Sequence, residues 1–548
     1  MIQKKDQVKR KKSRSMKNFN LPSSENIGFY NALTSSWEKL VKLEINDDGI
    51  ITDVKSIKSD NDDICFDVFI IPGFIDAHCH LLETPYYPEP NEDIEHISEE
   101  DLMKRAICNI NVARNNGITT LKDLGGRNFL SLNISKYLSK NTPRVFTSGC
   151  YFTSKGGHVC DRGAIIINNI EEFSKHIHML LDYNVHFVKI LHGDDGFDSN
   201  LLKNMVIFAK NKGMMVSCHV YTNKAATEAV AAGVDILEHA GNYDDNLLVK
   251  IKEAGIIVVP TFAAAYDSNK DNCANISDVN ATVLANWLEG EKIIIPKLIR
   301  MNIPFALGSD AGFYCFPMDY LFREIELLHN IFEISIKDIL FAALITTPKC
   351  LRMEDKLGRI SQGYYADFLL YRKNPLKTIT MLRNPDQVWI GGEKVVDMEH
   401  NPFQLQRLLA TNVNDILKYL ANNYFNCGKL NDQWSEDELK NWIDNHNDYC
   451  IGTFSSGELI GFCLSHFHVE SHKVHLENIF VKEEFRHRGI ARKMLEDTIR
   501  FYQKNNQTIR FVGLVVDGNK PSNHLLSSCN FANGSTMIWM QRNEKYRD

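Results

Sequence analysis

The chain has 548 residues, of which 44% are hydrophobic and 24% charged. This length exceeds what one hydrophobic core supports, so we expect several domains. The formal net charge of −7 argues against a general nucleic-acid-binding protein. The 13 cysteines are scattered and form no C-x-x-C pair, which favours free thiols in a reducing compartment and predicts a cytoplasmic protein. No apolar run approaches the roughly 18 residues of a membrane span.

The N-terminal region is strongly basic. Residues 1–17 carry eight lysines and arginines against one aspartate. No apolar segment follows that would complete a signal peptide. We therefore predict a disordered tail over residues 1–20, with an anchor to an anionic surface as the alternative.

The remaining chain predicts an α/β protein with three folded parts. Residues 72–354 alternate short apolar runs such as IPFALGSD with longer helical patterns, which predicts a (β/α)₈ barrel. Residues 21–71 and 355–403 read as short strands and turns, and together they predict a small composite β-sandwich. After a break at NPFQ, residues 404–548 begin with two helical patterns, LQRLLATNVNDILKYLANNYF and SEDELKNWIDNH, before strands and a further helix.

Six polar residues interrupt or end the apolar runs of the predicted barrel. Two histidines at i and i+2 after IPGFIDA point the same way from a strand, and neutral imidazoles bind divalent transition metals. A lysine inside a strand costs several kcal/mol unless it is paired or modified. Each residue alone has a structural explanation, such as a helix cap for the aspartate. Together, at the C-terminal ends of successive strands, they predict a binuclear metal site: His78, His80, Lys189, His219, His239 and Asp310.

These motifs resemble the amidohydrolase superfamily, in the subgroup of metal-dependent dipeptidases and imidazolonepropionase-like enzymes. The resemblance covers about residues 36–400 and includes IPGFIDAHCH, GITTLKDLGG, PRVFTSGCYFTSKGGH, FVKI, SCHVYT, EAVAAGVDILEHA, GSDAG and LGRISQGYYADFLLYRKNPL, in family order. It implies two divalent metal ions, with zinc expected, and hydrolysis of a small-molecule amide. A dipeptide or an N-acyl amino acid is the expected substrate, and a cyclic amide is the alternative.

The resemblance also implies a role for each residue. His78, His80 and Asp310 would hold the buried metal, His219 and His239 the second, and a carboxylated Lys189 would bridge them. Two such metals polarise the scissile carbonyl and lower the pKa of a bridging water. Asp310 would act as general base and then as general acid. His158 and Tyr221 match substrate-contacting positions, and a structural role is the alternative for both.

A second chemistry is predicted near the C-terminus. HLENIFVKEEFRHRGIARKMLEDTIRFY reads as a strand, a basic glycine-containing loop and an amphipathic helix. Free backbone N–H groups at a helix N-terminus suit a pyrophosphate. The segment resembles the acyl-CoA loop of the GNAT superfamily of N-acyltransferases, over about residues 405–545, which implies acetyl-CoA as cofactor and N-acetylation of an amine. The implied cofactor-binding residues are Arg486, His487, Arg488, Gly489, Ile490, Ala491 and Asn519.

This second region departs from its family in two places. Leu526 stands where the family often has a tyrosine acid, and Asn530 replaces a glycine. Glu477 is a candidate catalytic base, or equally a surface glutamate. The crowded histidines at 466, 468, 472 and 475 suggest a metal, although a polar strand face and loop is the preferred interpretation.

We therefore expect a bifunctional enzyme that hydrolyses an amide and acetylates an amine, in sequence if one reaction supplies the other. Two alternatives stay open. The C-terminal domain would sense acyl-CoA and regulate the hydrolase, or it would acetylate a protein lysine. The expected partners are a small-molecule amide and acetyl-CoA, with no nucleic acid and no membrane span. A homo-oligomer formed through the barrel is a further open expectation.

Overall fold

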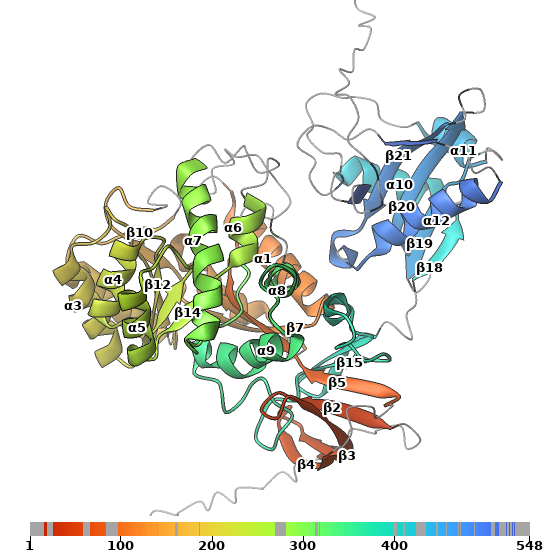
Figure 1. Cartoon of the computed structure of the whole chain (residues 1–548). Coiled ribbons are helices and arrows are strands. Elements are labelled where there is room, and N and C mark those ends of the chain that lie inside the picture. The colour runs from red at the N-terminus through yellow and green to blue at the C-terminus, as the bar shows by residue number, and fades with distance from the viewer. Residues whose placement is uncertain are drawn as a thin grey trace, which may run out of the picture. The chain divides into compact units, whose positions relative to one another are not determined.

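The chain divides into two compact units, Met1–Asn401 and Pro402–Asp548 (Figure 1). Among the described residues, no helix is long and apolar enough to cross a membrane. The computed structural model describes residues 16–18, 26–58, 66–83, 97–139, 141–158, 163–185, 187–268, 281–312, 316, 318–397, 403–408, 412–423, 435–444, 448–455, 458–468, 471, 473–486, 488–505, 510–513, 522, 525–526, 529 and 531.

One eight-stranded sheet of the first unit combines strands from both flanks. Its order is β1-β3-β2-β5-β15-β16-β17, with β4 paired to β3. β5 and β15 are antiparallel neighbours although they lie far apart in the chain. All residues of both strands are buried. The sheet is therefore completed only when the segments before and after the parallel strands come together. The strands are β1 (Met16–Asn18), β2 (Ile27–Asn31), β3 (Ser36–Asn46), β4 (Ile51–Lys58), β5 (Val68–Pro72), β15 (Phe368–Tyr371), β16 (Gln387–Ile390) and β17 (Glu393–Asp397).

Part of the predicted disordered tail belongs to this sheet. β1 pairs antiparallel with the C-terminal half of β3, with Met16 opposite Asn46. The prediction of disorder over residues 1–20 was therefore wrong for Met16–Asn18. Pairing with β3 gives the backbone N–H and C=O groups of this segment hydrogen-bond partners, and the composition of the segment does not reveal that partner strand. Residues 1–15 lie outside the described residues.

Parallel strands form the central part of the first unit. One sheet has the order β6-β7-β8, and the other has the order β10-β9-β11-β12-β13-β14. Isolated parallel bridges, Val258 with Phe305 and Cys79 with Ala311, connect β14 to β6 through the segment at 305–311. The result is a curled, mixed α/β arrangement, and IPFALGSD contributes single bridges instead of the expected strand. The strands are β6 (Phe74–Cys79), β7 (Ile118–Asp123), β8 (Arg144–Thr147), β9 (Tyr151–Thr153), β10 (Ile165–Ile166), β11 (Phe187–Leu191), β12 (Met215–His219), β13 (Ile236–Glu238) and β14 (Ile257–Val259).

Helices follow most of these strands and lie around the outside of the curled sheet (Figure 1). α3 buries Leu202, Met205, Val206 and Ala209, an apolar face at helical spacing. Side-chain caps such as that of Thr222, which accepts from the backbone N–H of Ala225, start helices soon after strands end. The helices are α1 (Glu99–Asn115), η2 (Arg127–Tyr137), α2 (Ile170–Asp182), α3 (Ser199–Asn211), α4 (Asn223–Ala232), α5 (Asp245–Ala254), α6 (Phe262–Ser268), α7 (Ala281–Arg300), α8 (Leu321–Phe332), α9 (Ile336–Phe341), η4 (Ala342–Thr346), η5 (Thr347–Leu351) and η6 (Ile379–Arg383).

The second unit has a five-stranded sheet with the order β18-β19-β20-β21-β22. Its neighbours are antiparallel except β21 and β22, which are parallel. α12 buries Met494, Leu495 and Tyr502. The elements are β18 (Gln404–Arg407), α10 (Val413–Asn423), α11 (Glu436–Asp444), β19 (Ile451–Ser455), β20 (Glu458–His468), β21 (Lys473–Val481), η8 (Glu483–Phe485), α12 (Ile490–Asn505) and β22 (Arg510–Gly513).

The helical pattern expected from residue 405 onward begins later than predicted. Gln404–Arg407 forms β18, which pairs with β19, and the helix starts at Val413. The apolar spacing of LQRLLATNVNDIL fits a helix, but pairing with β19 satisfies the backbone of 404–407 and Leu408 is buried in the core of this unit. Tertiary pairing thus overrides the local pattern.

Candidate functional site

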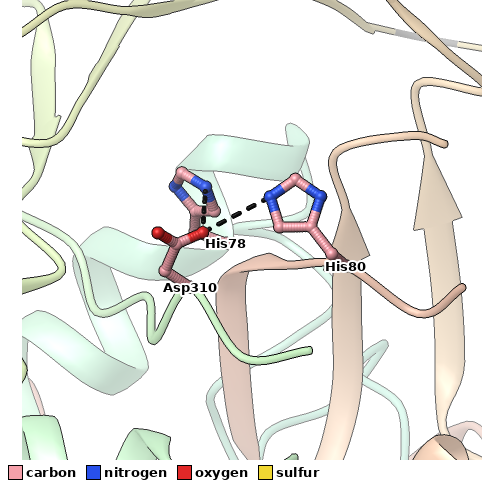
Figure 2. A group of neighbouring side chains, drawn as sticks. All are labelled: His78, His80 and Asp310. Carbon is pink, nitrogen blue, oxygen red and sulfur yellow. Dashed lines mark ion pairs between the residues drawn. The ribbon is translucent and has the colours of Figure 1, made fainter. Parts of the chain in front are cut away.

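Three of the predicted metal ligands converge in the first unit. His78 lies in β6, His80 follows its last residue, and Asp310 lies in the segment that bridges to β6. Asp310 Oδ1 is 3.1 Å from His78 Nε2 and 3.3 Å from His80 Nε2 (Figure 2). One ligand atom from each residue lies within 4.8 Å of the others, so the group has the donors and the spacing that a metal ion requires.

The backbone turns at these positions to aim the side chains. Asp310 has φ 57° and His239 has φ 67°, in the left-handed region that non-glycine residues seldom adopt. The turn at Asp310 is held by its own N–H, which donates to the carbonyl oxygen of His78 at 2.8 Å. Thr261, which contacts His239, also has a positive φ of 57°. Such outliers gather at functional sites, where the surrounding structure holds them.

A second pair of histidines lies beside the first group. The ring of His239 is 4.6 Å from that of His219 and 4.9 Å from that of His78, measured between centroids. His239 Nδ1 contacts Thr261 Oγ1 at 2.7 Å, so its Nε2 is the atom left to bind a ligand. Burial, followed by the charges of neighbouring histidines, holds the pKa of both His219 and His239 well below the usual range. Both rings are therefore neutral, the form that binds metal.

Lys189 lies in β11 with its ammonium group inside the protein. Its side chain is 1% exposed, and Nζ has no hydrogen-bond partner among the described residues. Burial lowers its pKa to about 8, although the negative charge of Glu238 acts in the opposite direction. Burying a charged amine without a partner costs free energy. This position therefore favours either a modification that removes the positive charge of Lys189 or a bound group that pairs with it.

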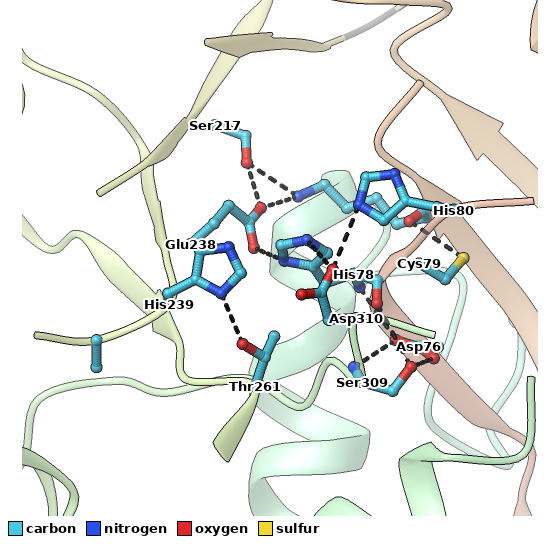
Figure 3. Close-up of polar contacts among 12 residues, drawn as sticks. Asp76, His78, Cys79, His80, Ser217, Glu238, His239, Thr261, Ser309 and Asp310 are labelled. Carbon is cyan, nitrogen blue, oxygen red and sulfur yellow. Dashed lines mark hydrogen bonds and ion pairs between the residues drawn. The ribbon is translucent and has the colours of Figure 1, made fainter. Parts of the chain in front are cut away.

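The sequence analysis missed the buried Glu238 and two of its buried partners, Lys122 and Ser217 (Figure 3). Glu238 Oε2 is 2.8 Å from His78 Nδ1, and Glu238 Oε1 accepts from Lys122 Nζ at 2.8 Å and from the Ser217 hydroxyl. Burial raises the pKa of Glu238, but the charges of Lys122 and His78 outweigh it and hold that pKa well below its usual range. The contact with Nδ1 leaves His78 Nε2 for a metal. The available signal was two opposite charges, in GITTLKDL and VDILEHA, inside otherwise apolar strands.

The predicted substrate residues lie beside the second histidine pair. The exposed His158 ring stacks on His219, with centroids 4.5 Å apart and an angle of 15° between the planes. The Tyr221 ring lies 4.3 Å from His219 and 5.0 Å from His239. Trp287, which the sequence analysis did not single out, packs on Tyr221 at 5.0 Å. These three side chains form one aromatic wall next to the buried imidazoles.

The second unit contains the predicted anion loop. Gly489 has φ 71°, and a Cβ added there would meet no atom within 4 Å. α12 begins at the next residue, the buried Ile490, and includes Ala491. Arg486 Nε donates to the carbonyl oxygen of Val481 at 2.9 Å, and the guanidinium of Arg488 lies over the Phe485 ring. The loop therefore presents an open backbone at a helix N-terminus.

Three further residues of the second unit were predicted to act in cofactor binding or catalysis. His487 and Asn519 lie outside the described residues. Glu477 is exposed on β21, at an irregularity in the pairing with β20. Partial desolvation raises its pKa, while His466 and His468 lower it. Irregularities of this kind redirect side chains and recur next to active sites.

Comparison with known proteins finds one matching family model in each unit. Residues 69–395 match the Amidohydrolase family, and residues 414–531 match the Acetyltransferase (GNAT) family. The first match spans more than half of the chain, and the chain belongs to the amidohydrolase family.

Individual relatives agree with the first assignment. Ochratoxinase from Aspergillus niger is 22% identical over 368 residues, which cover 59% of this chain and 75% of that protein. A crystal structure of an Xaa-Pro dipeptidase with methionine bound in its active site has a TM-score of 0.58 and 22% identity, covering 68% of this chain and 98% of that one. The crystal structure of A. niger ochratoxinase has a TM-score of 0.57 and 20% identity, covering 68% and 96%. These likenesses establish the amidohydrolase fold of the first unit.

Proposed function

We propose that the first unit hydrolyses an amide bond with two divalent metal ions in a closed (β/α)₈ barrel. His78, His80 and Asp310 would hold one ion, His219 and His239 would hold the other, and Lys189, as a carbamate, would serve as a ligand to both. The observation that carries the proposal is the convergence of His78, His80 and Asp310 on one point. Bound there, the cations would supply Lewis acidity and lower the pKa of a coordinated water.

The state of Lys189 supports its role as the bridge. A pKa of about 8 makes part of the amine neutral near neutral pH, and the neutral amine is the form that attacks carbon dioxide. The Nζ–carbon bond forms as one N–H proton leaves, and the product carries a negative charge. Because Nζ has no hydrogen-bond partner among the described side chains, an anionic carbamate between two cations gives this buried position the partner it lacks.

Asp310 is the proposed proton carrier. Burial raises its pKa, but the charge and hydrogen bond of His78, together with the hydrogen bond of His80, hold that pKa well below its usual range. The carboxylate is therefore ionised at neutral pH. It takes a proton from the attacking water at a carboxylate oxygen and passes that proton to the leaving amine nitrogen. A positioned acid–base group of this kind contributes about 10²–10⁴-fold to the rate.

Glu238 and the aromatic wall have supporting roles in this proposal. Glu238 orients His78 through Nδ1, and Lys122 balances the buried negative charge. His158 and Tyr221 contact the substrate beside the second histidine pair, where their polar tips orient the scissile amide. Trp287 supports the Tyr221 ring.

The substrate class follows from the relatives and from the site together. Two of the similar structures are those of an Xaa-Pro dipeptidase and of A. niger ochratoxinase. We propose a dipeptide, or an N-acyl amino acid with an aromatic or cyclic portion, as the substrate. The test is hydrolysis of a panel of Xaa-Pro dipeptides and N-acyl amino acids after metal removal and after zinc addition. Absence of zinc-dependent cleavage across the panel, in a protein that binds no metal, would contradict the proposal.

For the second unit, we propose acetyl-CoA binding and N-acetylation of an amine. Backbone N–H groups of 488–491 at the start of α12 would hold the pyrophosphate, and Gly489 leaves space for its approach. Arg486, His487 and Arg488 contribute positive charge, Asn519 completes the cofactor site, and Glu477 accepts the proton of the amine. Sequential action would let hydrolysis release the amine that is then acetylated.

One observation favours a sensing role for this unit instead. Leu526 occupies the place of the family's tyrosine acid, and its side chain packs in an apolar cluster with Leu476 and Gly513 nearby. No acid can act from that position. Release of free CoA thiol with a panel of small amines, including the products of hydrolysis, distinguishes transfer from sensing. Acetyl-CoA binding without thiol release for any amine supports the sensor.

A further inference from the structure

The second unit carries three histidines on one face of two paired strands. His466 and His468 are two residues apart on β20, and His475 on β21 lies directly opposite His466 in the antiparallel register. Alternate residues of a strand and directly opposed residues of a pair share one face of a sheet. The His468 ring lies 4.4 Å from that of His466 and 4.3 Å from that of His475, measured between centroids.

A buried carboxylate orients one of these rings. His466 Nδ1 is 2.9 Å from Asp448 Oδ2, and the Asp448 side chain is 1% exposed. Asp448 Oδ1 accepts the backbone N–H of Phe467, which fixes the carboxylate relative to β20. With its Nδ1–H donated to Asp448, His466 has Nε2 as its ligand atom. A carboxylate behind a histidine is the arrangement that orients metal-binding imidazoles and raises their basicity.

A carboxylate lies next to this face of the strand pair. Glu477 is two residues further along β21 than His475, at the irregularity in the pairing with β20. Three imidazoles with an adjacent carboxylate form a donor set for a transition metal. Lys473, which lies opposite His468 in the register, is the positive group that opposes binding.

We propose that His466, His468 and His475 bind one divalent transition-metal ion of the zinc, nickel or copper class, with Glu477 as a fourth ligand. Three imidazoles with one further position is an established zinc coordination set. Among the described residues, only His78, His80 and Asp310 already lie within 4.8 Å of one another as ligand atoms. Binding here therefore requires the rings of His468 and His475 to turn about χ2, which is a broad torsion, while Asp448 holds the ring of His466. The inference stands apart from both proposed activities. If the second unit does transfer an acyl group with Glu477 as the base, an ion bound to Glu477 would slow that transfer.

The test counts metal in the full chain, produced without a polyhistidine tag. Wild-type protein, His468→Gln/His475→Gln and the control His178→Gln are stripped with a chelator and equilibrated with micromolar zinc. Zinc per chain is then measured by elemental analysis. His178 is exposed on α2 in the first unit, where its Nδ1 contacts the carbonyl oxygen of Ser174 and its ring lies 5.8 Å from that of Phe208, so its replacement controls for loss of a surface histidine. The double variant should bind about one zinc fewer than wild type and control, because a site reduced to one histidine loses its coordination set.

A second measurement separates this site from the predicted hydrolase centre. The variant His78→Asn/His80→Asn is compared with a variant that also carries His468→Gln/His475→Gln. Zinc that remains bound in the first variant and is lost in the second belongs to the second unit. Cobalt substitution in this background should give a tetrahedral Co²⁺ spectrum that disappears with the same two changes. Equal zinc content in wild type and His468→Gln/His475→Gln, with both proteins folded by circular dichroism, overturns the proposal whatever the hydrolase centre does. If His78→Asn/His80→Asn does not fold, the wild-type comparison alone decides.

Discussion

Lys122 and Glu238 form an ion pair of 2.8 Å in which neither side chain is exposed. They come from β7 and from the end of β13, strands that are not hydrogen-bonded neighbours. The pair crosses the interior of the curled sheet and connects to His78 through the second carboxylate oxygen. One carboxylate therefore links the stability of this unit to the proposed metal site.

Breaking this pair should destabilise the first unit. Lys122→Met leaves the carboxylate of Glu238 buried without its main counter-charge, and removal of one partner of a buried pair costs about 3–5 kcal/mol. Lys122→Met/Glu238→Gln removes both charges and should recover part of that loss. The control Lys210→Met breaks the partly exposed pair with Asp235 and should cost less than about 1 kcal/mol. Calorimetric unfolding of wild type, these three variants and the single variant Glu238→Gln measures the differences. A double variant as unstable as the sum of its single variants would show that the two charges do not interact.

Lys189→Ala should lose the bridge between the two proposed metal positions. Alanine provides no group that can carry the carbamate, so metal content and hydrolysis should both fall. Short carboxylates such as acetate or propionate should restore part of the activity by occupying the same space. Lys203→Ala, which changes an exposed lysine of α3, serves as the control and should leave metal content unchanged. Unaltered metal content and hydrolysis in Lys189→Ala would remove Lys189 from the site.

Asp310→Asn should abolish hydrolysis and leave acetyl-CoA binding intact. The change removes the proton carrier, worth about 10²–10⁴-fold, and also weakens metal binding, so the loss should exceed that range. Hydrolysis assays and isothermal titration with acetyl-CoA measure the two effects. Retention of more than about a hundredth of the wild-type rate would argue against Asp310 as the acid–base group.

Gly489→Glu should abolish acetyl-CoA binding and leave hydrolysis intact, the reverse of Asp310→Asn. It adds negative charge where the pyrophosphate is expected, so acetyl-CoA binding should be lost while small amides are still hydrolysed. Because Gly489 has φ 71°, any side chain strains the backbone, and Gly489→Ala is the matched control for that strain. Alanine should weaken binding less than glutamate does. If Gly489→Glu also silences a correctly folded hydrolase, the sensing role replaces the two-enzyme interpretation.

Glu324 should make the first unit less stable as pH rises. Its carboxyl oxygens accept the backbone N–H groups of Phe262 and Ala263, at 3.1 and 2.6 Å. Burial nevertheless raises its pKa from 4.5 to about 8, against those two hydrogen bonds. Between these values the folded state holds a proton that the unfolded state has released. Stability contributed by this group is therefore lost as pH rises from about 4.5 to 8, by at most about 5 kcal/mol.

Glu324→Gln tests this dependence. Glutamine does not titrate and loses one acceptor at every pH, so its cost should be constant and the downward slope should disappear. Unfolding free energies at several pH values between 5 and 8 measure the slope for both proteins. Parallel curves for wild type and Glu324→Gln would show that Glu324 is ionised throughout.

The sequence predicted three residues that the structure brings together, but not the groups that orient them. His78, His80 and Asp310 could be predicted because each lies near the end of an apolar run, and strand ends share one edge of a parallel sheet. The partners of Glu238 could not, since Lys122 is 116 residues away and His78 is 160 residues away. Such contacts depend on how the sheet curls and on the register of its strands, which apolar spacing does not determine.

Local patterns failed where pairing partners decided the structure. Gln404–Arg407 fits an amphipathic helix by spacing, yet it pairs with β19 as a strand. Met16–Asn18 follows a run of basic residues, yet it pairs with β3. In both cases a neighbouring strand satisfies the backbone, and no property of the short segment alone reveals that neighbour.

The antiparallel pairing of β5 with β15 has a consequence for the order of synthesis. Phe69 pairs with Tyr371, so roughly 300 residues must leave the ribosome between the two partners. At about 5–20 residues per second this takes on the order of 15–60 s. During that interval the strand VFIIP can pair with β2 on one side while its other edge stays open. An open apolar edge recruits other chains. The nascent protein should therefore need a chaperone most until residue 371 emerges, and a chain truncated before β15 should aggregate.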